Sequence, residues 1–136
     1  MNVEAICGSF EGTGTWHDAA GKSMAYTVKQ TNRLITDGFE IEFKHDFADG
    51  SKTDAHFLMM WITPHLFQVR IGNNVVGNGY CIGNSCNYHI KAGEAFVEVS
   101  YRPDGQRLEV NGSSTKNAEG NYIAWHERLG RVTNNK

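Results

Sequence analysis

The chain has 136 residues, a length typical of one domain that buries its own core. Its formal net charge is −2, and its 13 lysines and arginines are scattered singly, so it lacks the basic surface of a nucleic-acid-binding protein. The longest apolar run, 57–62, is far shorter than the roughly 20 residues of a membrane-spanning helix, and the N-terminus lacks the pattern of a signal peptide. We therefore expect a single cytoplasmic domain over residues 1–136, with no nucleic-acid partner and no membrane span.

Turn-forming residues recur at short intervals along the whole chain. Asp-Gly alone occurs three times, and it suits tight hairpins because glycine tolerates a positive φ. Between these breaks the chain is rich in β-branched and aromatic residues, which are typical of strands. The pattern predicts strands over 12–18, 23–35, 39–47, 52–62, 66–71, 75–82, 86–91, 95–102, 107–111 and 121–129.

Short strands with no helical segment between them indicate an all-β meander. Such a meander closes on itself, because closure removes the unpaired edges. The predicted fold is an antiparallel up-and-down β-barrel of about 8–10 strands. Residues 1–10 are expected to form a turn or short helix over one end, and residues 112–120 the longest connection.

Alternation along the strands separates an inward from an outward face, since successive side chains point to opposite sides of a sheet. The segment 39–47 is the clearest case, with aromatic and aliphatic residues on one face and Glu and Lys on the other. The inward set is large, aromatic and sparsely polar, which is typical of a ligand pocket. The strand residues predicted to line it are Tyr26, Phe39, Ile41, Phe43, His45, Phe57, Met59, Trp61, Phe67, Tyr88 and Tyr101.

Two segments leave alternatives open. In 52–62 the outward face carries Leu58, Met60 and Ile62, which predicts either cover by a loop or the N-terminal segment, or a homodimer interface. In 121–129 either Tyr122, Ala124 and His126 face inward, or Ile123, Trp125 and Glu127 do. We favour the first, which adds His126 to the predicted ligand site.

The cysteines and histidines encode no metal site. Cys81 and Cys86 flank a four-residue connection, and we expect two buried thiols there, with a cross-strand disulfide as the alternative. None of the six histidines stands in a His-x-His or His-x-x-x-His pair.

The segment Gly12-Thr13-Gly14-Thr15-Trp16 resembles the Gly-x-Trp opening strand of the calycins, the lipocalin and fatty-acid-binding-protein group. That resemblance implies a barrel closed at one end by Trp16, with Arg128 from the last strand over its ring. The ending around His126 is loosely similar to the nitrobindin-like branch, whose members bind haem through an axial histidine. The Tyr-Pro pair of that branch is missing after Trp16, and we expect no cofactor.

These observations favour a lipocalin-like protein that binds a small hydrophobic or amphipathic molecule inside the barrel. Two alternatives remain beside the haem-binding one. The same barrel could be an isomerase, cyclase or dehydratase with a His or Glu base, or it could be filled by its own side chains and act through its outer surface.

Overall fold

The structure, a computed structural model, describes residues 3–116 and 121–132. A short 3-10 helix, η1, is followed by ten strands, which confirms the predicted all-β architecture. The elements in chain order are η1 Val3–Ile6, β1 Gly8–Asp18, β2 Ser23–Ile35, β3 Gly38–Phe47, β4 Lys52–Trp61, β5 Leu66–Ile71, β6 Asn74–Ile82, β7 Ser85–Ala92, β8 Ala95–Asp104, β9 Arg107–Lys116 and β10 Asn121–Arg131.

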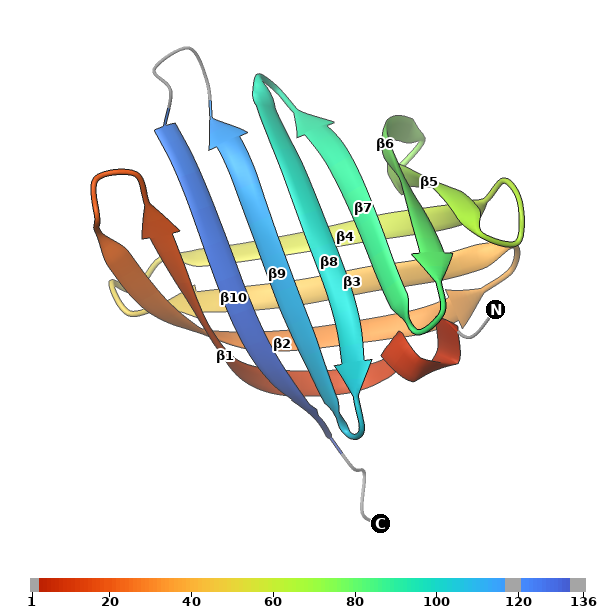
Figure 1. Cartoon of the computed structure of the whole chain (residues 1–136), viewed down its shortest axis with the longest axis horizontal. Coiled ribbons are helices and arrows are strands. Elements are labelled where there is room, and N and C mark those ends of the chain that lie inside the picture. The colour runs from red at the N-terminus through yellow and green to blue at the C-terminus, as the bar shows by residue number, and fades with distance from the viewer. Residues whose placement is uncertain (1–2, 117–120, 133–136) are drawn as a thin grey trace.

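The strands close into one antiparallel up-and-down barrel in which each strand pairs with its neighbours in sequence. The first strand completes the ring by pairing with the last, from Phe10 opposite Arg131 to Asp18 opposite Ile123. Figure 1 shows β7–β10 passing in front of β2–β4 and crossing them steeply, so that the barrel is flattened into two layers. This pairing leaves no free edge for another chain to extend.

Two strands are longer than the sequence pattern predicts by four residues or more. β1 begins at Gly8 rather than Gly12, because its first residues pair with β2 as far as Asn32. β9 continues to Lys116, so the prediction of a loop beginning at Gly112 is wrong. Small polar residues such as Ser113 and Ser114 stay in the ladder because β8 and β10 pair with them on both sides. The rest of that predicted connection, 117–120, lies outside the described residues.

The two halves of the barrel are filled differently. In the half near η1, which we call the plugged half, the interior is packed with fully buried apolar side chains, namely Phe10, Phe39, Ile41, Met59, Phe67, Leu108 and Leu129. Residues Val3 and Ile6 of η1 are buried, and the Asn32 side-chain amide donates a hydrogen bond of 2.7 Å to the Ile6 carbonyl. The predicted turn or helix over one end is confirmed for residues 3–6, whereas residues 8–10 belong to β1. The other half, toward the turns 18–23, 47–52 and 92–95, is the cavity half.

The cation at the closed end of the barrel is Arg131, and the expectation that Arg128 covers Trp16 is wrong. The Arg131 guanidinium lies 4.8 Å from the centroid of the Phe10 ring and donates hydrogen bonds to the Cys7 and Ala5 carbonyls. Arg128 is 66% exposed, with Nε 3.4 Å from Glu109 Oε1. The reason is parity, since the inward positions of β10 are odd-numbered.

Cys81 and Cys86 form a disulfide, so the expectation of two free thiols is wrong. The two residues stand opposite each other across the β6–β7 hairpin, and both are buried. Cross-strand pairing therefore brings the two sulfur atoms together. The third cysteine, Cys7, is free, and burial raises the pKa of its thiol to about 11.

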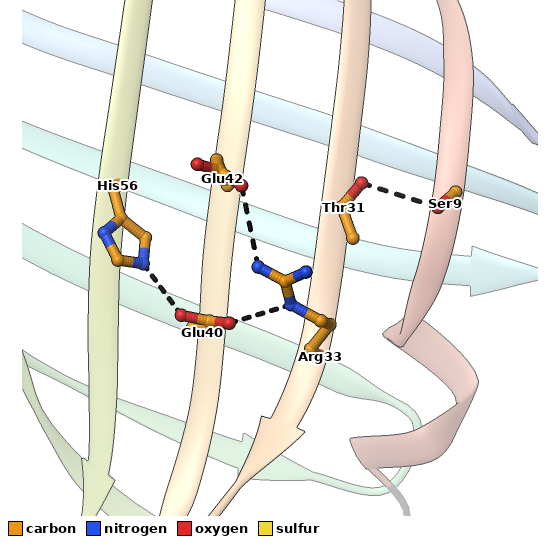
Figure 2. A network of polar contacts seen from close by, with 6 residues as sticks. All are labelled: Ser9, Thr31, Arg33, Glu40, Glu42 and His56. Atoms are coloured by element: carbon orange, nitrogen blue, oxygen red, sulfur yellow. Dashed lines mark hydrogen bonds and ion pairs between the residues drawn. The ribbon is translucent and has the colours of Figure 1, made fainter.

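The part of the outer wall around Arg33 and Glu40 is polar. Figure 2 shows Arg33 of β2 reaching both Glu40 and Glu42 of β3, at 2.8 Å and 3.6 Å, while His56 of β4 lies 2.8 Å from Glu40. The hydrogen bond from His56 is the main reason that the pKa of Glu40 is lowered. Such partly exposed pairs contribute little stability each, and they mark this wall as a solvated face.

The apolar outward residues of β4 are not covered by η1. Leu58 and Met60 are half-buried among their neighbours on the sheet, while the adjoining Ile62 is 57% exposed. The helix η1 packs against β7 and β8 instead. Cover by the N-terminal helix is therefore wrong for this stripe, and a homodimer through it stays a prediction.

Candidate functional site

The cavity half of the barrel encloses a space of about 270 Å³. Its wall is aromatic and aliphatic, with a few polar groups from β2, β3, β4, β7, β8 and β10. The lining residues are Trp16, Tyr26, Gln30, Phe43, His45, Phe47, Thr53, Phe57, Tyr88, Ile90, Val97, Val99, Tyr101, Val110, Ile123, Trp125 and Glu127. The structure thus brings together Tyr26, Phe43, His45, Phe57, Tyr88 and Tyr101 of the predicted ligand-binding set.

The other predicted strand residues face inward but lie in the plugged half. Phe39, Ile41, Met59 and Phe67 are fully buried in its core and do not line the cavity. Trp61 packs against Phe39 and Phe67, with ring centroids 5.4 Å and 5.7 Å apart. Alternation tells inside from outside but does not tell which half of a barrel is filled.

His126 lies on the outside of the barrel, so the expectation that it faces inward is wrong. Its side chain is 46% exposed, and Nε2 lies 2.6 Å from Glu109 Oε2 on the neighbouring strand. The inward residues of β10 are Ile123, Trp125 and Glu127. A haem ligand at His126 does not fit this geometry, because an imidazole on the outer wall cannot reach a group held in the cavity.

Glu127 is the centre of the polar end of the cavity. Its side chain is only 2% exposed, and Tyr26 donates a hydrogen bond of 2.8 Å to Oε2. His45 Nε2 lies 3.4 Å from the same oxygen, and the His45 ring stacks on Phe43 with centroids 4.5 Å apart. Three groups that can hold or donate a proton therefore meet at one point in an apolar wall.

Burial controls the protonation of this cluster. Desolvation raises the pKa of Glu127 to about 7, because the charged carboxylate loses its water, and the hydrogen bond from Tyr26 only partly offsets this. Desolvation likewise lowers the pKa of His45 to about 4. It also raises the pKa of Tyr26, and the charge of Glu127 adds to that shift. Near neutral pH the histidine and tyrosine are neutral, and the carboxyl exchanges its proton.

Two glycines make room for this arrangement. A Cβ on Gly14 would lie 2.7 Å from the Tyr26 hydroxyl, and a Cβ on Gly112 would collide with the Trp125 ring. Each glycine stands directly opposite the side chain it accommodates, in the pairs Gly14–Tyr26 and Gly112–Trp125. The missing side chains allow a large ring to lie flat across the neighbouring strand.

A second set of polar groups connects the cavity to the plugged half. The Tyr88 and Tyr101 hydroxyls are 3.1 Å apart, and the Gln30 amide donates to Tyr101 at 3.1 Å and to Asn32 at 3.0 Å. Burial raises the pKa of both tyrosines, which keeps them neutral. These hydrogen bonds satisfy polar groups that would otherwise be buried without partners.

The sequence analysis did not name Gln30 or Asn32, and it named Trp125 and Glu127 only in the alternative that it did not favour. For Gln30 and Asn32 the signal was present, since both share the even-numbered face of β2 with Tyr26 and Val28. For Trp125 and Glu127 the signal was the odd-numbered face of β10, which they share with Ile123 and Leu129.

Within residues 3–116 and 121–132, no three His, Cys, Asp or Glu side chains are grouped so that they could hold a metal ion. No helix in that part of the chain is long and apolar enough to cross a membrane.

No protein-family model matches this chain, and no curated protein sequence does. Solved structures share its fold. The S-type phycobiliprotein lyase CPES from Guillardia theta matches with a TM-score of 0.78 and 8% identity, over 98% of this chain and 92% of that one. Rv2717c from M. tuberculosis matches with a TM-score of 0.67 and 12% identity, over 95% of this chain and 94% of that one. EF1p2_mFAP2b bound to DFHBI matches with a TM-score of 0.53 and 10% identity, over 95% of each chain.

At identities of 8 to 12% this likeness shows the fold alone. The closure of ten antiparallel strands, the helix over one end and these neighbours agree with the resemblance carried by the Gly-x-Trp strand. The chain has the calycin-like β-barrel fold.

Proposed function

We propose that this protein binds a small hydrophobic or amphipathic molecule in the cavity half of its barrel. The observation that carries the proposal is the cavity of about 270 Å³, whose wall is mostly aromatic and aliphatic with a few convergent polar groups. An engineered apolar cavity of about 150 Å³ holds benzene, so a molecule of about two fused rings suits this space. Tyr26, Phe43, His45, Phe57, Tyr88 and Tyr101 would contact it.

The neighbours support the proposal at the level of the fold. EF1p2_mFAP2b was solved bound to DFHBI, and CPES is named as a phycobiliprotein lyase. The fold therefore holds a small molecule in at least one other protein. The ligand of this chain has to be argued from its own lining residues, because identity with these neighbours is too low to transfer one.

Filling the cavity tests the proposal. Titration with 2-methylnaphthalene, followed by calorimetry, should show saturable binding to the cavity that Trp16 and Trp125 line. Val97→Phe places a ring in the cavity and should weaken binding at least tenfold. The matched control is Val75→Phe, which makes the same change at a position that is 54% exposed on β6. Equal binding by both variants, or no binding by the unmodified protein, would contradict the proposal.

A second candidate function is proton-transfer catalysis on a hydrophobic carbonyl compound. It is favoured by the contact of Tyr26 and His45 with Glu127, whose pKa of about 7 suits a general base at neutral pH. The Glu127 carboxylate would take the proton from the carbon next to the carbonyl, and the electron pair of that C–H bond would move onto the carbonyl oxygen as an enolate. Glu127 then releases that proton to solvent, and addition of a solvent proton to the carbon returns the enolate to the carbonyl compound and completes the exchange.

The test uses 2-tetralone in heavy water, followed by proton NMR. The signal of the hydrogens next to its carbonyl should disappear faster with the protein than with the Glu127→Gln variant. Equal rates for the two proteins would remove this candidate and leave the binding proposal untouched.

A further inference from the structure

The polar end of the cavity lacks a cation. Among the described residues, no lysine or arginine lines the cavity, and its polar side chains are Tyr26, Gln30, His45, Thr53, Tyr88, Tyr101 and Glu127. All of these are neutral or acidic near neutral pH. A ligand carboxylate in this cavity would lose its water without gaining a charged partner, which is costly.

Glu127 offers the opposite kind of partner. Its carboxyl group is 2% exposed and belongs to the cavity wall. Among the described residues, the contacts from Tyr26 and His45 converge on Oε2, which leaves Oε1 for a donor from a ligand. Tyr26 fixes the orientation of the carboxyl group, so the second oxygen is held in place before a ligand arrives.

Resting on the binding function proposed above, we infer that the ligand is an aromatic or hydrophobic amine whose nitrogen binds the Glu127 carboxylate. The aromatic walls suit both parts of such a molecule. Phe43, Phe57 and Trp125 would pack against its rings, while the faces of Tyr26 and Trp125 attract a cation through their π-electrons. The complex is neutral, because the ammonium charge cancels the carboxylate charge.

The surroundings of Glu127 make this binding depend on pH. The titratable groups that face it are Tyr26 from β2, His45 from β3, Tyr88 from β7 and Tyr101 from β8, and all four are neutral near pH 7. His126, the preceding residue on the outer face of β10, also lowers the pKa of Glu127 through its charge. In the empty cavity the Glu127 pKa is about 7, so below that pH an ammonium ligand must displace a proton. The affinity should therefore rise roughly tenfold per pH unit up to pH 7 and level off above it.

Three ligands of similar size separate the alternatives on the unmodified protein. They are 2-(aminomethyl)naphthalene, which is a cation, 2-methylnaphthalene, which is neutral, and 2-naphthoic acid, which is an anion. At pH 7.5 the amine should bind at least tenfold more tightly than the hydrocarbon and the acid most weakly, as measured by calorimetry. Only the amine should gain affinity between pH 5.5 and 7.5.

Each other outcome has a definite meaning. Binding of the hydrocarbon with equal or weaker binding of the amine would overturn the inference while the proposed binding function stands. Tightest binding of the acid would overturn it in the same way. If none of the three binds, the proposed function fails as well.

A pair of variants ties the preference to one residue. Glu127→Gln keeps an acceptor for Tyr26 but removes the charge, and it should abolish both the preference for the amine and its pH dependence. Glu109→Gln makes the same change on the outer wall and should bind like the unmodified protein. If Glu127→Gln does not fold, the ligand series on the unmodified protein still decides, because it requires no variant. A preference for the amine that persists in folded Glu127→Gln would overturn the inference.

Discussion

Glu127 and His45 respond to burial in opposite directions. The folded protein holds the Glu127 proton up to about pH 7, whereas the unfolded chain releases it near 4.5, so this group lowers stability as the pH rises between those values. His45 is neutral in the folded protein down to about pH 4, whereas the unfolded chain binds a proton near 6.5. The contribution of His45 therefore raises the stability of the folded protein as the pH rises over nearly the same interval. The effects of Glu127 and His45 on stability largely cancel.

Removing the Glu127 carboxyl should reveal the pH dependence of stability that is due to His45. In Glu127→Gln the free energy of unfolding should rise by about 3 kcal/mol between pH 4 and pH 6.5, since a shift of one pKa unit corresponds to about 1.4 kcal/mol. In the unmodified protein the rise should be much smaller, because the shifts of Glu127 and His45 oppose each other. Urea denaturation at several pH values, followed by circular dichroism, measures both curves. Parallel curves would show that Glu127 has an ordinary pKa in the folded protein.

At the level of single elements, η1 depends on one cation. Arg131 at the end of β10 stacks on Phe10 and donates to the Cys7 and Ala5 carbonyls. Hydrogen bonds from a charged group and a cation–π contact together suggest a cost of about 2 kcal/mol for Arg131→Ala. Arg128→Ala, three residues earlier on the outer wall, should cost about 0.5 kcal/mol or less, because exposed ion pairs contribute little. Urea denaturation compares the two variants, and equal losses would contradict this role of Arg131.

The strands could be predicted from the sequence because each is bounded by turn residues and most alternate clearly. The segment 39–47 is an example, with every Glu and Lys on one face. β10 could not be predicted in the same way. Both of its faces mix polar and apolar residues, and the alternative that we favoured placed His126 inside and Glu127 outside. Inside the barrel the Glu127 carboxyl accepts a hydrogen bond from Tyr26, whose ring lies over Gly14.

Only part of the candidate site could be predicted, because alternation does not show which half of the barrel is filled. Phe43 and Phe39 are equivalent by alternation, yet the first lines the cavity and the second is fully buried in the core. What separates them is η1 at one end of the barrel, together with the polar chain through Gln30 and Asn32 that anchors it. Such long-range packing cannot be read from a local pattern of residues. The disulfide of Cys81 and Cys86 depends on the same kind of information, since the strand register decides it.

At the level of the whole molecule, the residues that stabilise the fold and the residues that line the cavity lie in different halves of the barrel. The plugged half holds most of the largest fully buried side chains, while the cavity half has walls with space between them. A close-packed interior resists changes in side-chain volume, whereas a lining that borders empty space tolerates them better. The cavity-lining residues, which determine ligand specificity, can therefore differ between barrels of this shape while the core of the plugged half maintains the fold.

Closure of the ring also sets an order of events during synthesis. β1 must pair with β10, and the two strands are separated by nearly the whole chain, so this contact forms late and slowly. Until β10 leaves the ribosome, one edge of β1 stays unpaired and open to other chains. Trp125 and Glu127 lie on β10, so the cavity of a nascent chain is incomplete until β10 is in place. The pairing of β10 with β1 therefore completes the binding site and removes the last unpaired strand edge in the same step.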